Sequence, residues 1–117
     1  MTAPRFLLHL EGAVAFLTTT VLYFHGDHPW WLYLLLALAP DLSMLGYLAG
    51  PRAGAAAYDA AHTYAFPVLL AAAGVVWDVG GLVAVSLVWV AHIGVDRAIG
   101  YGLKYPSGFK DTHLQRV

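Results

Sequence analysis

The sequence predicts an all-α fold, in which four transmembrane helices form an up-down-up-down bundle. Of the 117 residues, 60% are apolar and 11% are charged, whereas an ordinary soluble domain is about 25% charged. The apolar residues fall in four stretches, each close to the ~20 residues that a bilayer requires. A chain of this length forms one domain, so we expect residues 1–117 to be a single multi-pass domain of the cell inner (plasma) membrane.

Short loops rich in glycine, proline and aspartate separate the four predicted helices. The first loop is residues 26–29, the second is residues 50–52, and the third is residues 78–81. Trp30 and Trp31 open the second helix with an aromatic pair typical of a membrane interface. Such short connections predict antiparallel neighbours. The predicted helices cover residues 6–24, 30–49, 53–77 and 82–103, and a polar cytoplasmic tail covers residues 104–117.

Positive charges predict the orientation in the membrane. With four spans, all six Lys and Arg residues fall on the side that also holds both termini. The other two loops carry Asp27 and Asp78 and no basic residue. Basic residues concentrate on the cytoplasmic side of membrane proteins, so both termini are expected in the cytoplasm. The six basic residues are Arg5, Arg52, Arg97, Lys104, Lys110 and Arg116.

Ionisable side chains inside the predicted helices indicate a functional site, since such residues are rare in membranes and usually functional. Alternation of the helices places six of them in the cytoplasmic half, roughly 8–18 Å deep at ~1.5 Å per residue. Each of the four helices contributes at least one. They are Glu11, Asp41, Asp59, His62, His92 and Asp96.

The spacing of these residues indicates metal ligands. Asp59 and His62 are three residues apart, and His92 and Asp96 are four apart, so each pair shares a helix face. Carboxylate bundles that hold two metal ions also combine single acids with acid–histidine pairs. Four acids in one layer cannot all stay ionised without compensation. One or two divalent ions would neutralise them, and imidazole with carboxylate suits Zn, Mn or Fe.

Each residue of this layer has an expected role. Glu11 or Asp41 would act as general base towards a metal-bound water, and Arg97 would face an anionic head group. The glycine-rich tail either lies at the membrane interface or folds back over the cytoplasmic mouth, where His113 would reach the site. The expected metal ligands are Asp41, Asp59, His62, His92 and Asp96.

Five motifs stand out along the chain: Pro40-Asp41-Leu42-Ser43-Met44-Leu45-Gly46-Tyr47, Ala61-His62-Thr63-Tyr64, His92-Ile93-Gly94-Val95-Asp96-Arg97, Gly100-Tyr101-Gly102-Leu103-Lys104-Tyr105 and Thr112-His113-Leu114. Over nearly the whole chain they resemble a bacterial family described as domain of unknown function 4260. That resemblance implies a small integral membrane protein and supplies no activity. The Pro40-Asp41 and His62-Thr63 steps are similar, more weakly, to motifs of membrane-bound metal-dependent hydrolases.

These observations favour a metal-dependent membrane hydrolase that acts on a lipid-like or amphiphilic substrate at the cytoplasmic leaflet. A di-iron oxidase is a variant, because the same ligands suit iron. A proton or metal-ion conduit, formed by a homodimer, is the main rival, although the outer halves of the helices carry no charge. Haem held between His62 and His92 is a further alternative. A net charge of −1 indicates no nucleic-acid partner, and the absence of cysteine excludes iron–sulfur clusters and Cys-ligated zinc.

Overall fold

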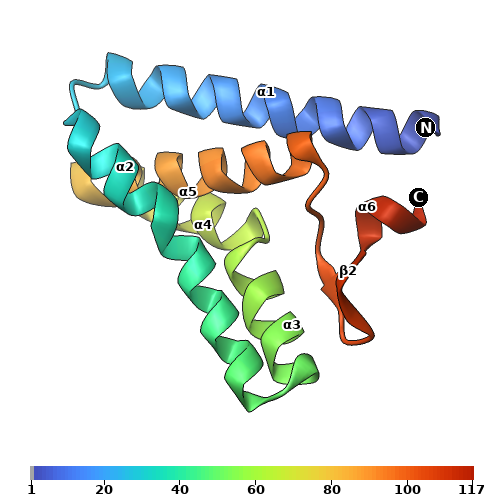
Figure 1. Cartoon of the computed structure of the whole chain (residues 1–117). Helices are drawn as coiled ribbons and strands as arrows, with labels where there is room; N and C mark the ends of the chain where they lie inside the picture. The colour runs from blue at the N-terminus through green and yellow to red at the C-terminus, as the bar shows by residue number, and fades with distance from the viewer. Residues whose placement is uncertain (1) are drawn as a thin grey trace.

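The computed structural model describes residues 2–117, which form α-helices, one 3₁₀ helix and a small antiparallel sheet (Figure 1). The elements in chain order are α1 (Ala3–His25), α2 (Trp30–Leu38), the 3₁₀ helix η1 (Ala39–Ala49), α3 (Pro51–Ala61), α4 (Ala65–Val76), α5 (Gly80–Ile99), β1 (Lys104–Tyr105), β2 (Gly108–Thr112) and α6 (His113–Arg116).

Four helical segments are long and apolar enough to cross a membrane, which suggests a multi-pass membrane protein. They pack together, as the sequence predicts. Two of them are single α-helices, α1 and α5. The other two are each divided within the structure, one into α2 and η1 and one into α3 and α4. The four segments are Ala3–His25, Trp30–Ala49, Pro51–Val76 and Gly80–Ile99.

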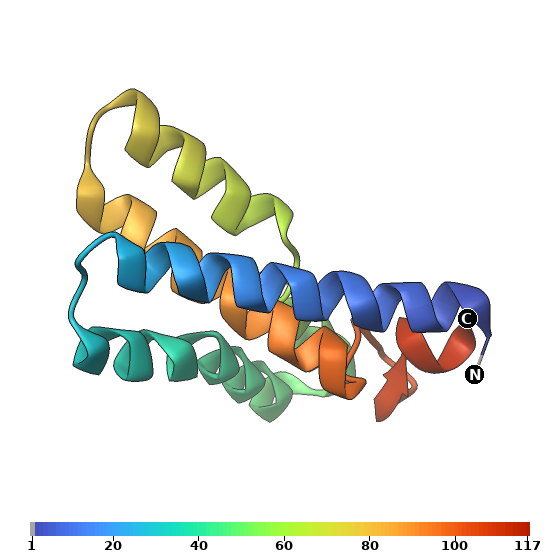
Figure 2. The same cartoon turned by 90° about the horizontal axis from the view of Figure 1, so that it is seen from above.

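The close pairing of α1 with α5 is the scaffold of the fold. The two helices run side by side in opposite directions (Figures 1 and 2). Gly12 and Gly94 lie where they cross, and a Cβ built on Gly94 would be only 2.6 Å from the carbonyl oxygen of Gly12. Small residues allow membrane helices to approach this closely. The crossing therefore holds the C-terminal half of α5 firmly against α1.

The second predicted helix is not one straight α-helix, because it tightens into the 3₁₀ helix η1 at Ala39. Pro40 explains the change. Proline has no N–H to donate, and in an α-helix its ring would clash with the carbonyl of Leu36. The N–H of Ala39 already bonds the Leu36 carbonyl three residues back, which is the 3₁₀ pattern.

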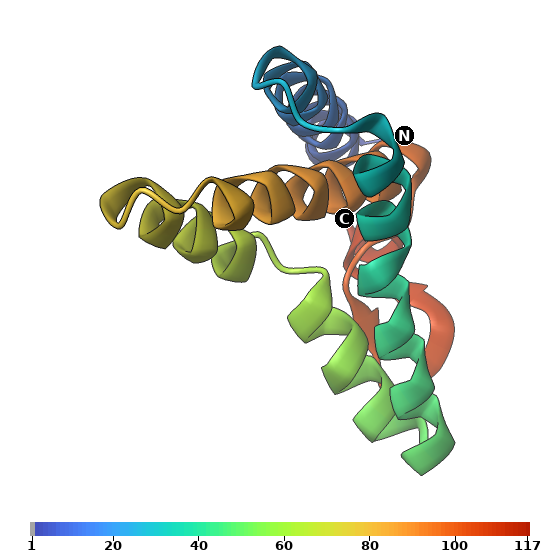
Figure 3. The same ribbon diagram turned by 90° about the vertical axis from the view of Figure 1, so that its left-hand side faces the viewer.

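The third predicted helix is also divided, between Ala61 and Ala65. Pro67 cannot donate to the carbonyl of Thr63, so an unbroken helix would leave that bond unmade. At the break the Thr63 hydroxyl donates to the carbonyl of Asp59 at 2.6 Å, which the backbone N–H of Thr63 would bond in an unbroken helix. As a result, α3 and η1 form an arm that leaves the α1–α5 pair, while α4 takes another direction (Figure 3). The arm places one turn of η1 and the end of α3 beside α5.

The C-terminal tail departs from the all-α prediction. Helix α5 ends at Ile99 and not at residue 103, because Gly100 adopts φ +107°, a left-handed conformation that suits glycine and ends a helix. Strands β1 and β2 then form a hairpin in which Lys104 pairs with Thr112. Arg5 of α1 donates to the Gln115 carbonyl at 2.8 Å. Of the two arrangements expected for the tail, the structure has the one that folds back.

Candidate metal centre

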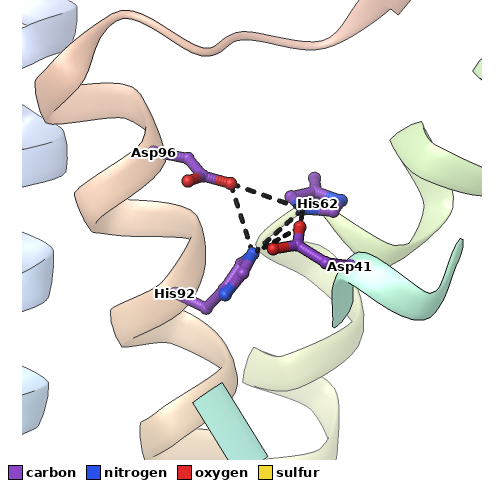
Figure 4. Close-up of side chains that lie close together, drawn as sticks. All are labelled: Asp41, His62, His92 and Asp96. Atoms are coloured by element: carbon purple, nitrogen blue, oxygen red, sulfur yellow. Dashed lines mark hydrogen bonds and ion pairs between the residues drawn. The ribbon is translucent and has the colours of Figure 1, made fainter. Parts of the chain in front are cut away.

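Four side chains from three elements converge beside the middle of the molecule (Figure 4). Asp41 comes from the first turn of η1, and His62 is the residue that ends α3. His92 and Asp96 are one turn apart on α5. One nitrogen or oxygen of each lies within 4.8 Å of the other three. The depth and facing of these residues in the sequence predict this convergence.

Five of the six distances among the four atoms match the edges of a metal coordination sphere. The Nε2 atom of His62 lies 3.3 Å from Oδ1 of Asp41 and 3.4 Å from Oδ2 of Asp96. For Nε2 of His92 these distances are 3.1 Å and 3.2 Å, and the two Nε2 atoms are 3.2 Å apart. A tetrahedral zinc ion with bonds of ~2.0–2.1 Å has ligands ~3.3–3.4 Å apart. His62, His92 and either carboxylate are therefore spaced to share one ion of this size.

Backbone hydrogen bonds fix which ring nitrogens face the centre. The Nδ1 atom of His62 is 2.8 Å from the carbonyl oxygen of Tyr58, and that of His92 is 2.5 Å from the carbonyl oxygen of Ala37. A carbonyl only accepts, so each Nδ1 carries the proton and donates it. In a neutral ring the other nitrogen, Nε2, then presents a lone pair to the centre. Histidines that bind metals are oriented in the same way.

Local sequence explains why the Ala37 carbonyl is free to accept. In the 3₁₀ pattern the carbonyl of Ala37 would pair with the N–H of residue 40, but Pro40 has none. The carbonyl of Tyr58 already accepts the backbone N–H of His62 at 2.9 Å, and its second lone pair takes the Nδ1–H of the same residue. Pro40 thus supplies the acceptor that orients His92, and the last turn of α3 supplies the acceptor that orients His62.

Charge favours a cation at this position. With both rings neutral, two carboxylates and two imidazole lone pairs face one another, and the centre then lacks positive charge. A divalent ion would balance the two carboxylates and satisfy both lone pairs. His62 and His92 are 2% and 8% exposed, whereas the Asp41 side chain is 41% exposed. Asp41 therefore marks the side from which an ion or a substrate can enter.

Neighbouring groups hold His62 in place. The ring of Tyr58 stacks on the imidazole, with centroids 3.7 Å apart and planes 9° apart. Arg97 donates to the carbonyl oxygen of His62 at 2.9 Å. Trp89 donates its indole N–H to the carbonyl oxygen of Ala61 at 2.6 Å. The end of α3 is thus fixed to α5 by two side chains of α5.

Three expected site residues lie outside the cluster. Asp59 accepts a hydrogen bond from the backbone N–H of Lys104 at 2.6 Å, so it fastens the tail hairpin to α3. Arg97 binds the His62 carbonyl, lies near Nε2 of His113 and covers the ring of Tyr64. Glu11 is exposed on α1.

His113 does not reach the four-residue cluster, although the sequence predicted that a folded-back tail would bring it there. Its Nδ1 accepts from the backbone N–H of Leu103 at 2.8 Å, and its Nε2 lies beside Arg97. Burial, together with the Arg97 charge, lowers the pKa of the His113 imidazole. A neutral ring is consistent with the hydrogen bond that it accepts.

Sequence reasoning missed the residues that surround and orient the four ligands. Pro40, three residues after Ala37, was the one available signal for the acceptor of His92. Tyr58 lies four residues before His62, on the same helix face. Lys104 carried no local signal, because only the folding of the tail brings it to the site.

The chain matches the family model described as Domain of unknown function (DUF4260) over residues 5–117. Among curated proteins and solved structures, none matches the chain. The weaker likeness to metal-dependent hydrolases therefore has no support from these comparisons. A match over nearly the whole chain is enough to assign the family, and this protein belongs to the DUF4260 family.

Proposed function

We propose that this protein is a membrane metalloenzyme that holds one divalent ion, best suited to zinc, between Asp41, His62, His92 and Asp96. The observation that carries the proposal is the pair of imidazoles whose Nδ1 protons are bound to backbone carbonyls. Both Nε2 lone pairs consequently face two carboxylate oxygens at 3.1–3.4 Å. A set of two histidines and two aspartates balances the charge of a divalent ion and suits Zn, Mn or Fe.

The same distances argue against the other cofactors considered. Haem would need the two imidazoles on opposite faces of its ring, but their Nε2 atoms are 3.2 Å apart and both contact the same carboxylates. A di-iron centre needs about six protein ligands. Within residues 2–117 the cluster offers one ligand atom from each of four residues.

The reaction that we propose is hydrolysis of an amphiphilic substrate. Four protein ligands leave a tetrahedral ion no open position, so the reaction requires Asp41, the most exposed of the four, to leave the ion and make room for a water molecule. The ion would then lower the pKa of that water molecule. The water oxygen would bond to the acyl or phosphoryl centre, and its proton would pass to the departing oxygen. Asp41, the most exposed of the four ligands, is the carboxylate that can carry that proton. Arg97 supports His62 through its carbonyl and acts as a positioning residue.

We also propose that both termini are cytoplasmic, which places the centre near the cytoplasmic face. All six basic residues support this orientation by the positive-inside rule. Reporter fusions after Val117 and within the loop at Asp27 test it. A periplasmic signal from the fusion at Val117 would contradict the orientation.

Elemental analysis of the detergent-purified protein tests the metal site. We expect about one divalent ion per chain, lost in both His62→Ala and His92→Ala. His25→Ala is the matched control, because His25 is exposed and lies outside the cluster. Helical circular dichroism should persist in all three variants. Full metal content in both His62→Ala and His92→Ala, or no metal in the wild type grown with each candidate metal, would refute the proposal.

A further inference from the structure

Two cavities adjoin the candidate metal centre and differ in chemistry. One has a volume of about 290 Å³ and an apolar lining that includes the residues just before two of the ligands. It is lined by Leu36, Ala39, Pro40, Ala61, Val85 and Trp89. The other has a volume of about 230 Å³ and includes two ligands in its wall. Its lining includes Asp41, Tyr58, Asp96, Tyr101, Lys104 and Phe109.

Lys104 is the basic side chain in the wall of the second cavity. The residue is 4% exposed, and its Nζ donates to the carbonyl oxygen of Phe109 at 2.8 Å. Aromatic rings surround the ammonium group, with the centroid of Phe109 at 3.5 Å and that of Tyr58 at 4.4 Å. An ammonium group has three N–H donors. One of them bonds the Phe109 carbonyl, and the aromatic rings offer the ammonium group only cation–π contacts, with which an anion in the cavity can compete.

The charge of Lys104 lacks a direct partner in the described part of the chain. Across residues 2–117 no carboxylate forms an ion pair with its Nζ. The carboxylate of Asp59 is close, but it accepts from the backbone N–H of Lys104. A metal ion would take up the charge of Asp41 and Asp96. The buried ammonium would then need an anion from outside the chain, because a buried charge is costly without a partner.

We propose that the cavity at Lys104 binds the phosphate or carboxylate head group of an anionic amphiphile whose hydrocarbon chain occupies the apolar cavity. The position of the reacting bond, between the two cavities and beside the metal ligands, rests on the proposed function. The strength of the binding depends in part on the metal, because Asp41 and Asp96 line the same cavity, but its dependence on Lys104 does not. Lys104, and not Arg97 as the sequence suggested, is the residue that recognises the head group.

Binding of soluble probes tests this assignment by titration calorimetry on the full chain in a non-ionic detergent. The probes are hexyl phosphate, inorganic phosphate and hexanol. Hexyl phosphate should bind most tightly. Lys104→Met should weaken its binding by about 10- to 100-fold, the range expected for a lost hydrogen bond to a charged group. Lys110→Met is the matched control, since Lys110 is exposed on β2, and it should bind like the wild type.

A second variant tests the site of the hydrocarbon chain. Val85→Phe fills part of the apolar cavity and should remove the preference for hexyl phosphate over inorganic phosphate. If the wild type binds hexyl phosphate and inorganic phosphate equally well, the site accepts free phosphate, and the proposal that it binds an amphiphile is wrong. Equal losses in Lys104→Met and Lys110→Met would overturn the role of Lys104. If Lys104→Met does not fold, as judged by circular dichroism, Lys104→Gln removes the charge and keeps a donor for the Phe109 carbonyl.

The metal content of every variant separates this inference from the proposed function. Lys104→Met should keep its metal, because Lys104 is not a ligand. His92→Ala, without metal, should bind hexyl phosphate more weakly, because the charges of Asp41 and Asp96 are then uncompensated in the same cavity wall, but the remaining binding should still depend on Lys104. If the wild type holds no metal but still binds hexyl phosphate through Lys104, the proposed enzyme is refuted and the anion site is supported. If the wild type holds its metal but its binding of hexyl phosphate does not depend on Lys104, the anion site is refuted and the proposed metal site is supported.

Discussion

Widening the glycine crossing between α1 and α5 should destabilise the protein and disturb the metal centre together. A Cβ at Gly12 would lie 2.5 Å from Cβ of Arg97, 2.7 Å from the Gly94 carbonyl oxygen and 2.9 Å from the backbone N of Ala98. Carbon atoms in contact prefer ~3.5–4.0 Å, so Gly12→Val requires the helices to move apart by about 1 Å. Backbone atoms and a Cβ cannot swing aside as a flexible side chain does.

Overpacking of this kind costs typically about 1–3 kcal/mol, and the two added methyl groups place Gly12→Val near the upper end. Valine regains at most about 0.5 kcal/mol in helix propensity over glycine. We expect a net loss of about 2 kcal/mol, which lowers the thermal midpoint by roughly 6–10 °C for a chain of this size. Because His92 and Asp96 flank Gly94 on α5, metal affinity should fall as well.

Thermal unfolding in detergent, followed by circular dichroism, measures the first effect, and competition with a metal chelator measures the second. Gly80→Val is the control, because a Cβ at Gly80 meets nothing within 4 Å. Its midpoint should match that of the wild type within about 2 °C. A Gly12→Val midpoint as high as that of Gly80→Val would refute the close crossing.

Three further results are expected. Asp59→Ala should keep its metal and Asp96→Ala should lose it, which elemental analysis checks. Asp59→Ala also frees the N–H of Lys104, so the tail hairpin of this variant should be less protected in hydrogen exchange. Pro40→Ala supplies an N–H that competes with His92 for the Ala37 carbonyl, so chelator competition should show metal affinity about tenfold weaker. Hydrogen bonds from Arg116 and Ser107 lower the pKa of Asp111 to about 2, so its contribution to hairpin stability is present above about pH 4 and is lost as the pH falls towards 2. The ring resonances of Tyr105, which Arg116 covers at 3.6 Å, should follow that titration, and Asp111→Asn should abolish it.

The four apolar segments and the convergence of the cluster followed from the sequence because both depend on local properties. Hydropathy over ~20 residues locates a span, and the rise per residue sets the depth of each polar group. Asp41, His62, His92 and Asp96 therefore fall in one layer wherever the helices pack. The same argument also placed Glu11 and Asp59 in that layer, so which residues meet depended on how the helices pack.

The two divided helices show where that reasoning stops. Asp59 and His62 share a face only if the helix continues, but His62 ends α3 with φ −114°. The His62 ring contacts Asp41, whereas Asp59 contacts the backbone of Lys104. Pro40 and Pro67 were visible in the sequence, yet whether a proline bends, tightens or ends a helix depends on which neighbours satisfy the freed carbonyls. His92 is one of those neighbours, from 55 residues away.

The positions of Arg97 and Lys104 escaped the sequence for a similar reason. Arg97 follows Asp96 directly, and successive residues on a helix point about 100° apart. Its guanidinium therefore reaches the His62 carbonyl from beside the ligands and does not share their cavity. Lys104 reaches that cavity through the turn at Gly100 and the contact of its N–H with Asp59, which no local pattern reveals.

The 3₁₀ form of η1 also gives the arm a straight edge. With three residues per turn, side chains three apart lie directly above one another. Leu42, Leu45 and Leu48 accordingly line up along η1 and are 66%, 65% and 88% exposed. In an α-helix the same three leucines would spiral by ~60° at each step. Pro40, by tightening this helix, thus both frees an acceptor for His92 and arranges a continuous hydrocarbon ridge that hydrophobic surroundings can cover.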